Sequence, residues 1–379
     1  MQDPWQFALR LHLTHGLGLR QARLLVKRVG GLAQVWQTPN ADLRDMLGLR
    51  LGSALGTPPP DWDQAQALVR HWLDSAPDGQ RHRILTWGDT DYPQNLTELV
   101  DPPLLLFVTE TQTDDTGHWP PSVALVGSRG ATPQGLALAR QWAHELADAG
   151  WCVVSGLAHG IDGAAHAGAL MSDASGCVTM AVMGTGPDLV YPHAHAQLKS
   201  RIVARGRCLT EFLPGTGARP AHFPMRNRLV AALSSGLVVI EAGTGSGSLI
   251  SAQCALDQGK EVMAVPGSIR SPLSRGCHAL LRQGATLVES TAEVLGALPP
   301  LIQAQTRTAT LGLEPGGLFA EDAQTTALRT ALGHDPIPID ELQARLGLDV
   351  GPLLAKLLNL ELEGRLARLP GDRVQWLSD

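Results

Sequence analysis

Residues 123–166 read VALVGSRGATPQGLALARQWAHELADAGWCVVSGLAHGIDGAAH, and this stretch decides the fold. The apolar runs Val123–Val126 and Cys152–Val154 have the composition of strands that are buried on both faces of a sheet. Each run meets a turn of small residues that leads into a helical segment: Pro133–Ala149 after the first, and a helix that Asp162 can cap after the second. Ligands of open parallel sheets bind where such turns gather, and helix N-termini favour anions, so we expect a phosphate site here.

The same alternation of strands and helices continues to about Leu298, which predicts an α/β protein with a doubly wound parallel sheet. Two strands before the quoted stretch, Ile84–Trp87 and Leu104–Val108, are expected to extend this sheet. We place the sheet domain at residues 87–298. Its further strands are expected at Val178–Met183, Cys208–Phe212, Leu237–Ile240 and Glu261–Val265, and its further helices at His195–Ala204, Arg226–Leu233 and Ser248–Leu256.

Helical segments precede and follow the sheet domain. Residues 1–86 are expected to form a helical domain, in which Thr14–Gly31 resembles a helix-hairpin-helix. Such a hairpin either packs within a small helical domain, which its acidic flanks favour here, or holds a DNA backbone through peptide N–H groups. Residues 299–322, rich in Pro, Gln, Thr and Gly, predict a linker. Residues 323–379 follow a winged-helix plan, with three helices and a two-stranded wing, whose acidic composition favours protein interaction over DNA binding.

The composition favours a globular protein of the cytoplasm. The first residues do not form a basic segment followed by an apolar run, so we expect no signal peptide and no membrane span. The five cysteines are scattered without a CxxC pair, which predicts reduced thiols and no metal site. The net charge is −6 overall, yet it is +2 over residues 122–297 and −4 on each side of them. A local arginine patch can therefore still bind a polyanion.

Six small-residue or arginine-rich turns follow predicted strands or precede predicted helices. One such turn is weak evidence for a ligand site, but six at one edge of a sheet favour anion binding. Arg129, Arg226 and Arg228 lie in these segments and can hold phosphates through bidentate contacts. The segments are residues 127–129, 155–162, 184–186, 223–228, 241–248 and 266–268.

The turns exclude some ligand classes. The sequence GSRGATPQG differs from the GxGxxG of dinucleotide-binding folds, and the chain contains no GxxxxGK[ST], so we expect no nucleotide cofactor. His159, Asp162 and His166 have the spacing of a metal site, but a helix cap with packed histidines is favoured. Glu241 is either a catalytic acid or an acceptor for loop amides, and the second role is favoured. The turns therefore offer anion binding without an evident nucleophile, base or metal site, which indicates a binding protein rather than an enzyme.

Together these motifs resemble the DNA-processing protein A family, also called DprA or Smf. The resemblance covers residues 122–290, and it implies an extended Rossmann-like sheet that binds single-stranded DNA without sequence preference and forms a homodimer. It further implies that the protein passes this DNA to the recombinase RecA during natural transformation, displacing single-strand-binding protein, without a cofactor. The motifs that carry it are VGSR (126–129), SGLAHGID (155–162), Ala165-His166, Tyr191-Pro192, FPMRNR (223–228), SGSLI (246–250), AVPGS (264–268) and Gly284-Ala285.

The resemblance also implies which residues contact DNA. Phosphate contacts are expected from the arginines, from Ser128 and from the turn amides, while Phe223 either stacks on a base or packs in the core. The alternative is an enzyme that processes nucleotides or nucleoside monophosphates, since phosphoribohydrolases also place a Gly-rich loop beside a glutamate, here Glu241. The predicted DNA-binding residues are Gly127, Ser128, Arg129, Gly156, His159, Gly160, His193, Lys199, Phe223, Arg226, Asn227, Arg228, Ser246, Gly247 and Ser248.

Two predicted contacts depart from the family pattern. His159 stands where the family usually has arginine, and His193 where it often has lysine. A permanent charge is thereby replaced by an imidazole, which is cationic only when it is protonated. We therefore expect weaker DNA binding than in more basic members, strengthening as the pH falls toward about 6. Lys199 is expected to compensate in part.

Overall fold

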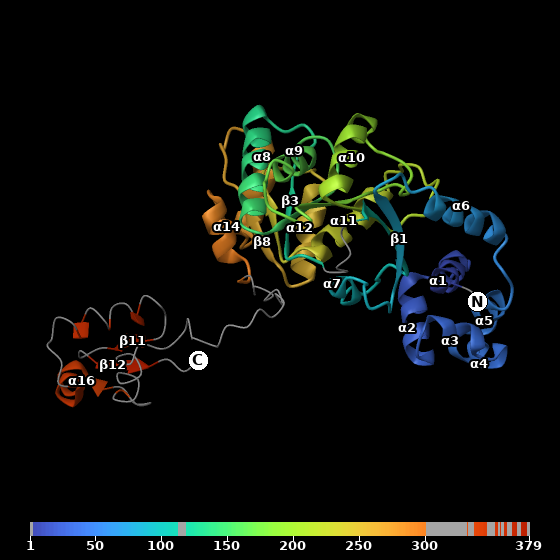
Figure 1. Cartoon of the computed structure of the whole chain (residues 1–379), viewed down its shortest axis with the longest axis horizontal. Helices are drawn as coiled ribbons and strands as arrows, with labels where there is room; N and C mark the ends of the chain where they lie inside the picture. The colour runs from blue at the N-terminus through green and yellow to red at the C-terminus, as the bar shows by residue number, and fades with distance from the viewer. Residues whose placement is uncertain are drawn as a thin grey trace, which may run out of the picture. The chain divides into compact units, whose positions relative to one another are not determined.

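The computed structural model describes residues 3–112, 119–300, 332, 337–346, 353–354, 357, 360–361, 366–369 and 373–376. The chain divides into two compact units, residues 1–302 and 303–379 (Figure 1). From residue 301 onward, the predicted linker lies outside the described residues.

A nine-stranded sheet forms the centre of the first unit, in the order β1-β2-β6-β5-β4-β3-β7-β8-β9. Strands β3 to β9 are parallel to one another, whereas β2 is antiparallel to both β1 and β6. The eight predicted strands are confirmed with small shifts of their ends, while β9 was not predicted. Their bounds are β1 Gln80–Thr86, β2 Leu105–Thr111, β3 Ser122–Val126, β4 Cys152–Ser155, β5 Thr179–Val182, β6 Gly206–Thr210, β7 Gly236–Val239, β8 Glu261–Ala264 and β9 Thr286–Leu287.

Helices cover both faces of this sheet, which confirms the doubly wound prediction. Alternate side chains of β3 point to opposite faces, Val123 and Leu125 to one and Ala124 and Val126 to the other. One face packs against α8, α9, α10 and α14, and the other against α11, α12 and α13. The bounds are α8 Pro133–Asp148, α9 Ile161–Ala169, α10 Ala196–Arg205, α11 His222–Leu233, α12 Ser248–Asp257, α13 Arg275–Arg282 and α14 Thr291–Ala297, with the short helices α7 Gln94–Thr97, η1 His193–His195 and η2 Pro272–Ser274.

Six helices precede the sheet, and the predicted hairpin is formed by the first two of them. Its turn contains Gly16, and α2 ends at Gly30, whose φ of 90° is the left-handed conformation that glycine adopts readily. These helices share a core with Leu105 and Phe107 of β2. The helical region ends at Asp74, so the predicted border at residue 86 wrongly assigns β1 to it. The bounds are α1 Pro4–Leu13, α2 Leu19–Val29, α3 Leu32–Gln37, α4 Asn40–Leu47, α5 Leu49–Leu55 and α6 Trp62–Asp74.

The second unit contains a three-stranded sheet in the order β10-β12-β11. Strands β11 (Leu366–Leu369) and β12 (Arg373–Trp376) form the predicted antiparallel wing, and β10 (Ile337–Pro338) pairs with β12. Helix α16 (Ile339–Leu346) buries Leu342 in a leucine-rich core. Across the described parts of both units, we find no helix that is long and apolar enough to cross a membrane.

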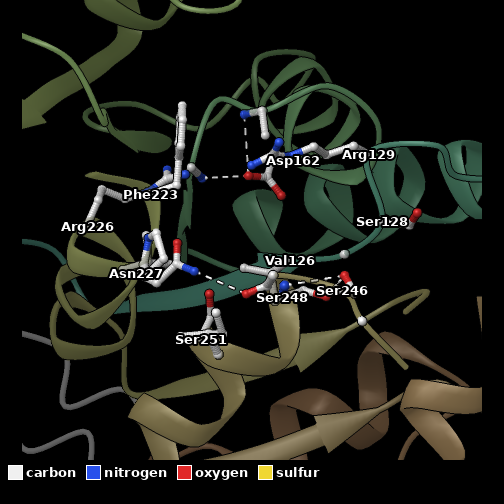
Figure 2. A pocket seen from close by; sticks show the side chains of 18 of the residues that line it. Val126, Ser128, Arg129, Asp162, Phe223, Arg226, Asn227, Ser246, Ser248 and Ser251 are labelled. Carbon is white, nitrogen blue, oxygen red and sulfur yellow. Dashed lines mark hydrogen bonds between the residues drawn. The ribbon is translucent and has the colours of Figure 1, made fainter. Parts of the chain in front are cut away.

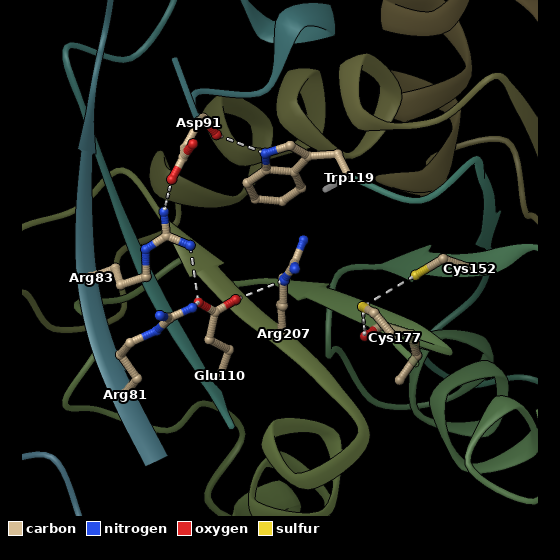
Figure 3. A network of polar contacts seen from close by, with 9 residues as sticks. Arg81, Arg83, Asp91, Glu110, Trp119, Cys152, Cys177 and Arg207 are labelled. Atoms are coloured by element: carbon tan, nitrogen blue, oxygen red, sulfur yellow. Dashed lines mark hydrogen bonds and ion pairs between the residues drawn. The ribbon is translucent and has the colours of Figure 1, made fainter. Parts of the chain in front are cut away.

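A buried carboxylate joins the three strands at the antiparallel end of the large sheet (Figure 3). Glu110 of β2 is 1% exposed and lies directly opposite Arg81 of β1 and Arg207 of β6. Its oxygens accept hydrogen bonds from Arg207 Nε at 2.8 Å, Arg81 Nη2 at 2.8 Å and Arg83 Nη1 at 3.1 Å. Removing one member of a buried ionic group is costly, because the charges that remain are kept from water.

We expect Glu110→Gln to lower the free energy of unfolding by about 3 kcal/mol, measured by urea denaturation, because it leaves the buried guanidinium of Arg207 and the partly exposed ones of Arg81 and Arg83 without their carboxylate. Asp91→Asn is the control, since Asp91 is 49% exposed and pairs with Arg83 at the surface. It should cost less than about 1 kcal/mol. Equal losses for the two variants would contradict the assignment.

His166 is a fully buried titratable group on α9. Its Nδ1 lies 2.7 Å from Thr179 Oγ1 on β5, and burial lowers the pKa of His166 to about 3. Between this pKa and the ordinary value of 6.5, the unfolded chain binds a proton that the folded chain does not. Stability is therefore lost as the pH falls below 6.5.

At about pH 5 this linkage is expected to cost ~2 kcal/mol relative to neutral pH. His166→Gln, which cannot titrate, should flatten the fall in unfolding free energy between neutral pH and pH 5. The control variant His71→Asn removes an imidazole that is exposed on α6, and it should keep the wild-type slope. A wild-type slope in His166→Gln would show that His166 is not the group responsible.

Candidate functional site

A cavity of about 730 Å³ opens at the carboxyl ends of β3 and β7 (Figure 2). The strand order reverses between these two strands, so their following loops diverge and leave a crevice, the usual ligand site of doubly wound sheets. The structure brings together most of the predicted residues in its lining. Those that line it are Gly127, Ser128, Arg129, Gly156, Phe223, Arg226, Asn227, Ser246, Gly247 and Ser248.

Glu241 holds the turn after β3 against the end of β7. The Ser128 amide donates to the Glu241 carbonyl at 2.7 Å, and a Cβ at Gly127 would lie 2.9 Å from that carbonyl. The Glu241 carboxylate accepts from Thr132 N at 2.8 Å and from Thr132 Oγ1 at 2.5 Å. The turn that presents Arg129 is therefore anchored by both the main chain and the side chain of Glu241.

The Glu241 carboxylate also occupies the N-terminus of α8. In dinucleotide-binding folds, the helix after the first strand receives the ligand's pyrophosphate at this position. Here Gly135 packs so closely that a Cβ on it would lie 2.5 Å from Glu241 Cδ. The favoured role of Glu241 as an acceptor for a loop amide is confirmed. A catalytic role is not supported, because both carboxylate oxygens are bound to Thr132.

Two buried charged groups, Arg226 and Asp162, lie at the floor of the cavity. Arg226 is 4% exposed and Asp162 is 6% exposed, and Arg226 Nη1 donates to the Val182 carbonyl at 2.5 Å. Burial lowers the pKa of Arg226 to about 10, and burial raises the pKa of Asp162, while each charge opposes the shift of the other. The guanidinium rests directly against Gly156, where any Cβ would overlap it. Arg226 therefore shapes the floor rather than projecting into solvent.

The prediction that Asp162 caps its helix is wrong. The N-cap of α9 is Gly160, and Asp162 lies within the first turn. Its carboxylate accepts from the amides of Gly156 at 3.2 Å and Ala158 at 3.4 Å, so it closes the preceding turn. The favoured interpretation that His166 is a packed histidine is confirmed by its burial against Thr179. Among the described residues, no group of three or more potential ligands could hold a metal ion.

Arg129 and the aromatic side chains form an exposed wall of the cavity. Arg129 is exposed, and its Cζ lies 5.2 Å from the ring centroid of Phe223, within the range of a cation–π contact. The ring of Tyr191, which is 46% exposed, lies 5.5 Å from that of Phe223. Phe223 remains partly exposed at the cavity, so it is available for stacking.

The N-terminus of α12 forms the opposite wall. Asn227 Nδ2 donates to the Gly247 carbonyl at 3.1 Å, which fixes the loop after β7 against α11. The hydroxyls of Ser246 and Ser248 lie 2.6 Å apart, and Ser248 N donates to Ser246 Oγ at 3.3 Å (Figure 2). Amides and hydroxyls at a helix N-terminus are suited to an anion.

Arg219 also lines the cavity but was missed from the sequence, as was Tyr191 as a site residue. Arg219 lies in the loop between β6 and α11, and it is exposed. The only sequence signal was its position four residues before Phe223, because an isolated arginine in a loop carries no periodicity. Tyr191 belongs to the Tyr191-Pro192 motif, but a DNA contact was predicted from the sequence for His193, two residues later, and none for Tyr191.

Five predicted residues lie outside the lining, namely His159, Gly160, His193, Lys199 and Arg228. Gly160 has φ 79° and ψ −128°, a glycine conformation that lets its backbone pack against the Ser128 carbonyl. His159 is exposed with its ring 5.0 Å from that of His195, and His193 is exposed on η1. Lys199 Nζ donates to the carbonyls of Pro187 at 2.6 Å and Leu189 at 3.2 Å, and its expected role as a compensating charge stays a prediction. The pH dependence expected from His159 and His193 stays a prediction.

Arg228 is the clearest correction. It was predicted to hold phosphates together with Arg129 and Arg226, but its Nη2 pairs with Glu211 at 2.5 Å and its Nε lies 3.5 Å from Asp101. The physical reason is helix geometry: residues two positions apart on α11 point about 200° away from each other. When Arg226 points to the floor of the cavity, Arg228 must face the other side of the helix.

Comparisons with known proteins agree with this geometry. A family model for DNA recombination-mediator protein A matches residues 83–299, and a model for the DprA winged helix domain matches residues 314–372. The second match confirms the predicted winged-helix domain.

Individual relatives match over much of the chain. Protein Smf of Escherichia coli is 35% identical over 316 residues, which cover 80% of this chain and 79% of that protein. DNA processing protein DprA of Streptococcus pneumoniae is 43% identical over 207 residues, which cover 55% of this chain and 71% of that protein. The X-ray structure of Streptococcus pneumoniae DprA superposes with a TM-score of 0.66 at 33% identity, covering 78% of this chain and 99% of that one. The chain therefore belongs to the family of DNA recombination-mediator protein A, also called DprA or Smf.

Proposed function

We propose that this protein binds single-stranded DNA without sequence preference in the cavity between β3 and β7. The observation that carries the proposal is the pairing of an exposed arginine, Arg129, with an aromatic surface, Phe223 and Tyr191, on one wall. The N-terminus of α12 faces it. Phosphates fit the arginine and the helix N-terminus, and unpaired bases fit the rings, whatever their sequence.

The charges around the cavity support an extended anion rather than a single phosphate. Arg129 and Arg219 are both exposed lining residues, while the buried Arg226 is balanced by Asp162. Two separated surface cations can hold successive phosphates of one strand. The alternative enzyme lacks support, because its candidate acid, Glu241, is bound to Thr132.

Family membership extends the proposal to the cellular role. We propose that the protein acts in the cytoplasm as a homodimer, receives single-stranded DNA during natural transformation and loads RecA onto it, displacing single-strand-binding protein. The family description as a recombination mediator supports this role. The acidic winged-helix domain, which matches the family's own, is proposed to contact proteins rather than DNA.

We expect Arg129→Ala to weaken binding of oligothymidine by roughly ten- to hundredfold, because it removes a charge-assisted phosphate contact. In a salt titration, the slope of log affinity against log salt should fall by about 0.7. Arg140→Ala is the control, since Arg140 is an exposed arginine of α8 outside the lining. Loss of affinity in both variants, or in neither, would contradict the site.

The proposed mediator role is tested separately, by measuring RecA filament assembly with the wild-type protein and the same two variants. Wild-type protein and Arg140→Ala should speed RecA filament assembly on oligonucleotides that are coated with single-strand-binding protein, whereas Arg129→Ala should not. Tight DNA binding without faster assembly would separate the two claims, keeping the DNA site and rejecting RecA loading.

Arg228→Gln should give the opposite pattern to Arg129→Ala. Because Arg228 pairs with the buried Glu211, its loss is expected to lower the free energy of unfolding by about 3 kcal/mol. DNA affinity of the folded protein should change less than twofold. Urea denaturation and DNA titration on the same samples measure both effects. Weakened DNA binding with an unchanged free energy of unfolding would show instead that Arg228 contacts the DNA.

A further inference from the structure

Two cysteines lie side by side at the amino ends of β4 and β5, the edge of the sheet opposite the cavity. Cys152 is the first residue of β4, and Cys177 comes two residues before Thr179, which pairs with Val153. Their Sγ atoms lie 3.8 Å apart (Figure 3). The sulfur atoms are therefore close enough that a modest local shift would bring them to the roughly 2 Å bond length of a disulfide.

The two thiols differ in access. Cys177 is partly exposed and follows the exposed turn residues Ser175 and Gly176, so a small reagent in solution can reach it. Cys152 is 1% exposed. Burial raises the pKa of the Cys152 thiol, although the Arg207 guanidinium acts in the opposite direction. A reagent should therefore react first at Cys177, and Cys152 can then react only with the neighbouring sulfur.

We propose that Cys177 and Cys152 form a reversible thiol-modification site for small disulfides of the glutathione disulfide class. The Cys177 thiolate attacks one sulfur of glutathione disulfide, whose S–S bond breaks and releases one glutathione thiolate. Cys152 gives up its proton and attacks Cys177 Sγ, forming the protein disulfide and releasing the second glutathione. Two cysteine thiols are oxidised and one glutathione disulfide is reduced, and the two protons that the cysteines lose pass to the two glutathione thiolates, giving two glutathione molecules.

The disulfide would close a loop that carries part of the cavity. Residues 152–177 contain β4, α9 and the turn of Gly156, which the Asp162 carboxylate closes from α9. Closing this loop restricts the unfolded chain, so oxidation should raise the thermal unfolding midpoint by on the order of 5 °C. The bond forms at the opposite ends of the strands from the cavity, so affinity for oligothymidine should change less than twofold.

The test uses the full-length protein with increasing glutathione disulfide, followed by alkylation and mass mapping of non-reduced peptides. Cys254 is the matched control, because it is also partly exposed. We expect Cys177 to appear in a peptide linked to Cys152, while Cys254 appears as a stable glutathione adduct. Dithiothreitol should restore both thiols and the original unfolding midpoint.

Two variants make the order of events measurable. In Cys152→Ser, Cys177 should accumulate as a glutathione adduct, because the attacking thiol has been removed. In Cys177→Ser, Cys152 should stay reduced. Three results would overturn the proposal: a stable adduct at Cys177 in the wild-type protein, a bond from Cys177 to another cysteine, or unreacted Cys177 at every concentration tested. All three results are measured on the wild-type protein, so they do not depend on whether a variant folds.

Discussion

The Glu241 carboxylate at the first turn of α8 is the interaction on which the site depends. It supplies an internal negative charge where related folds receive a nucleotide phosphate, and it bonds to Thr132 through both oxygens. The main-chain carbonyl of Glu241 accepts a hydrogen bond from the Ser128 amide, and this bond fixes the turn after β3. In our proposal, an external anion therefore binds beyond this turn, between Arg129 and the N-terminus of α12.

The arginines of this edge divide into buried and exposed ones with different roles. Arg226 is buried and donates to the Val182 carbonyl, and the nearby Asp162 charge favours its charged form. The buried side chain shapes the floor, and removing Asp162 would leave a buried positive charge without this stabilisation. Arg129 lies at the surface over Phe223, where it can exchange water for a phosphate at low cost. We therefore propose that the exposed wall contacts the DNA, and that the buried floor fixes the shape of the cavity.

The sequence predicted the sheet well because apolar strands and small-residue turns are local signals. The runs at Val123–Val126 and Leu237–Ile240 needed no knowledge of distant residues, and both are strands in the structure. Side-chain direction was harder to predict: Arg226 and Arg228 share one motif, yet helix geometry sends them to opposite sides. Arg219 was missed because loop closure alone brings it to the cavity. Strand β9, only two residues long, is too short to show a pattern.

The measurement that tests this account most directly is a crystal structure of the full-length protein with a short oligothymidine. The account predicts a phosphate within hydrogen-bonding distance of Arg129, a second at the amides of Gly247 and Ser248, and a base against Phe223. The Glu241 carboxylate should remain on Thr132, as it is without DNA. DNA bound at the α1–α2 hairpin or on the winged-helix domain, with water alone in the cavity, would contradict it.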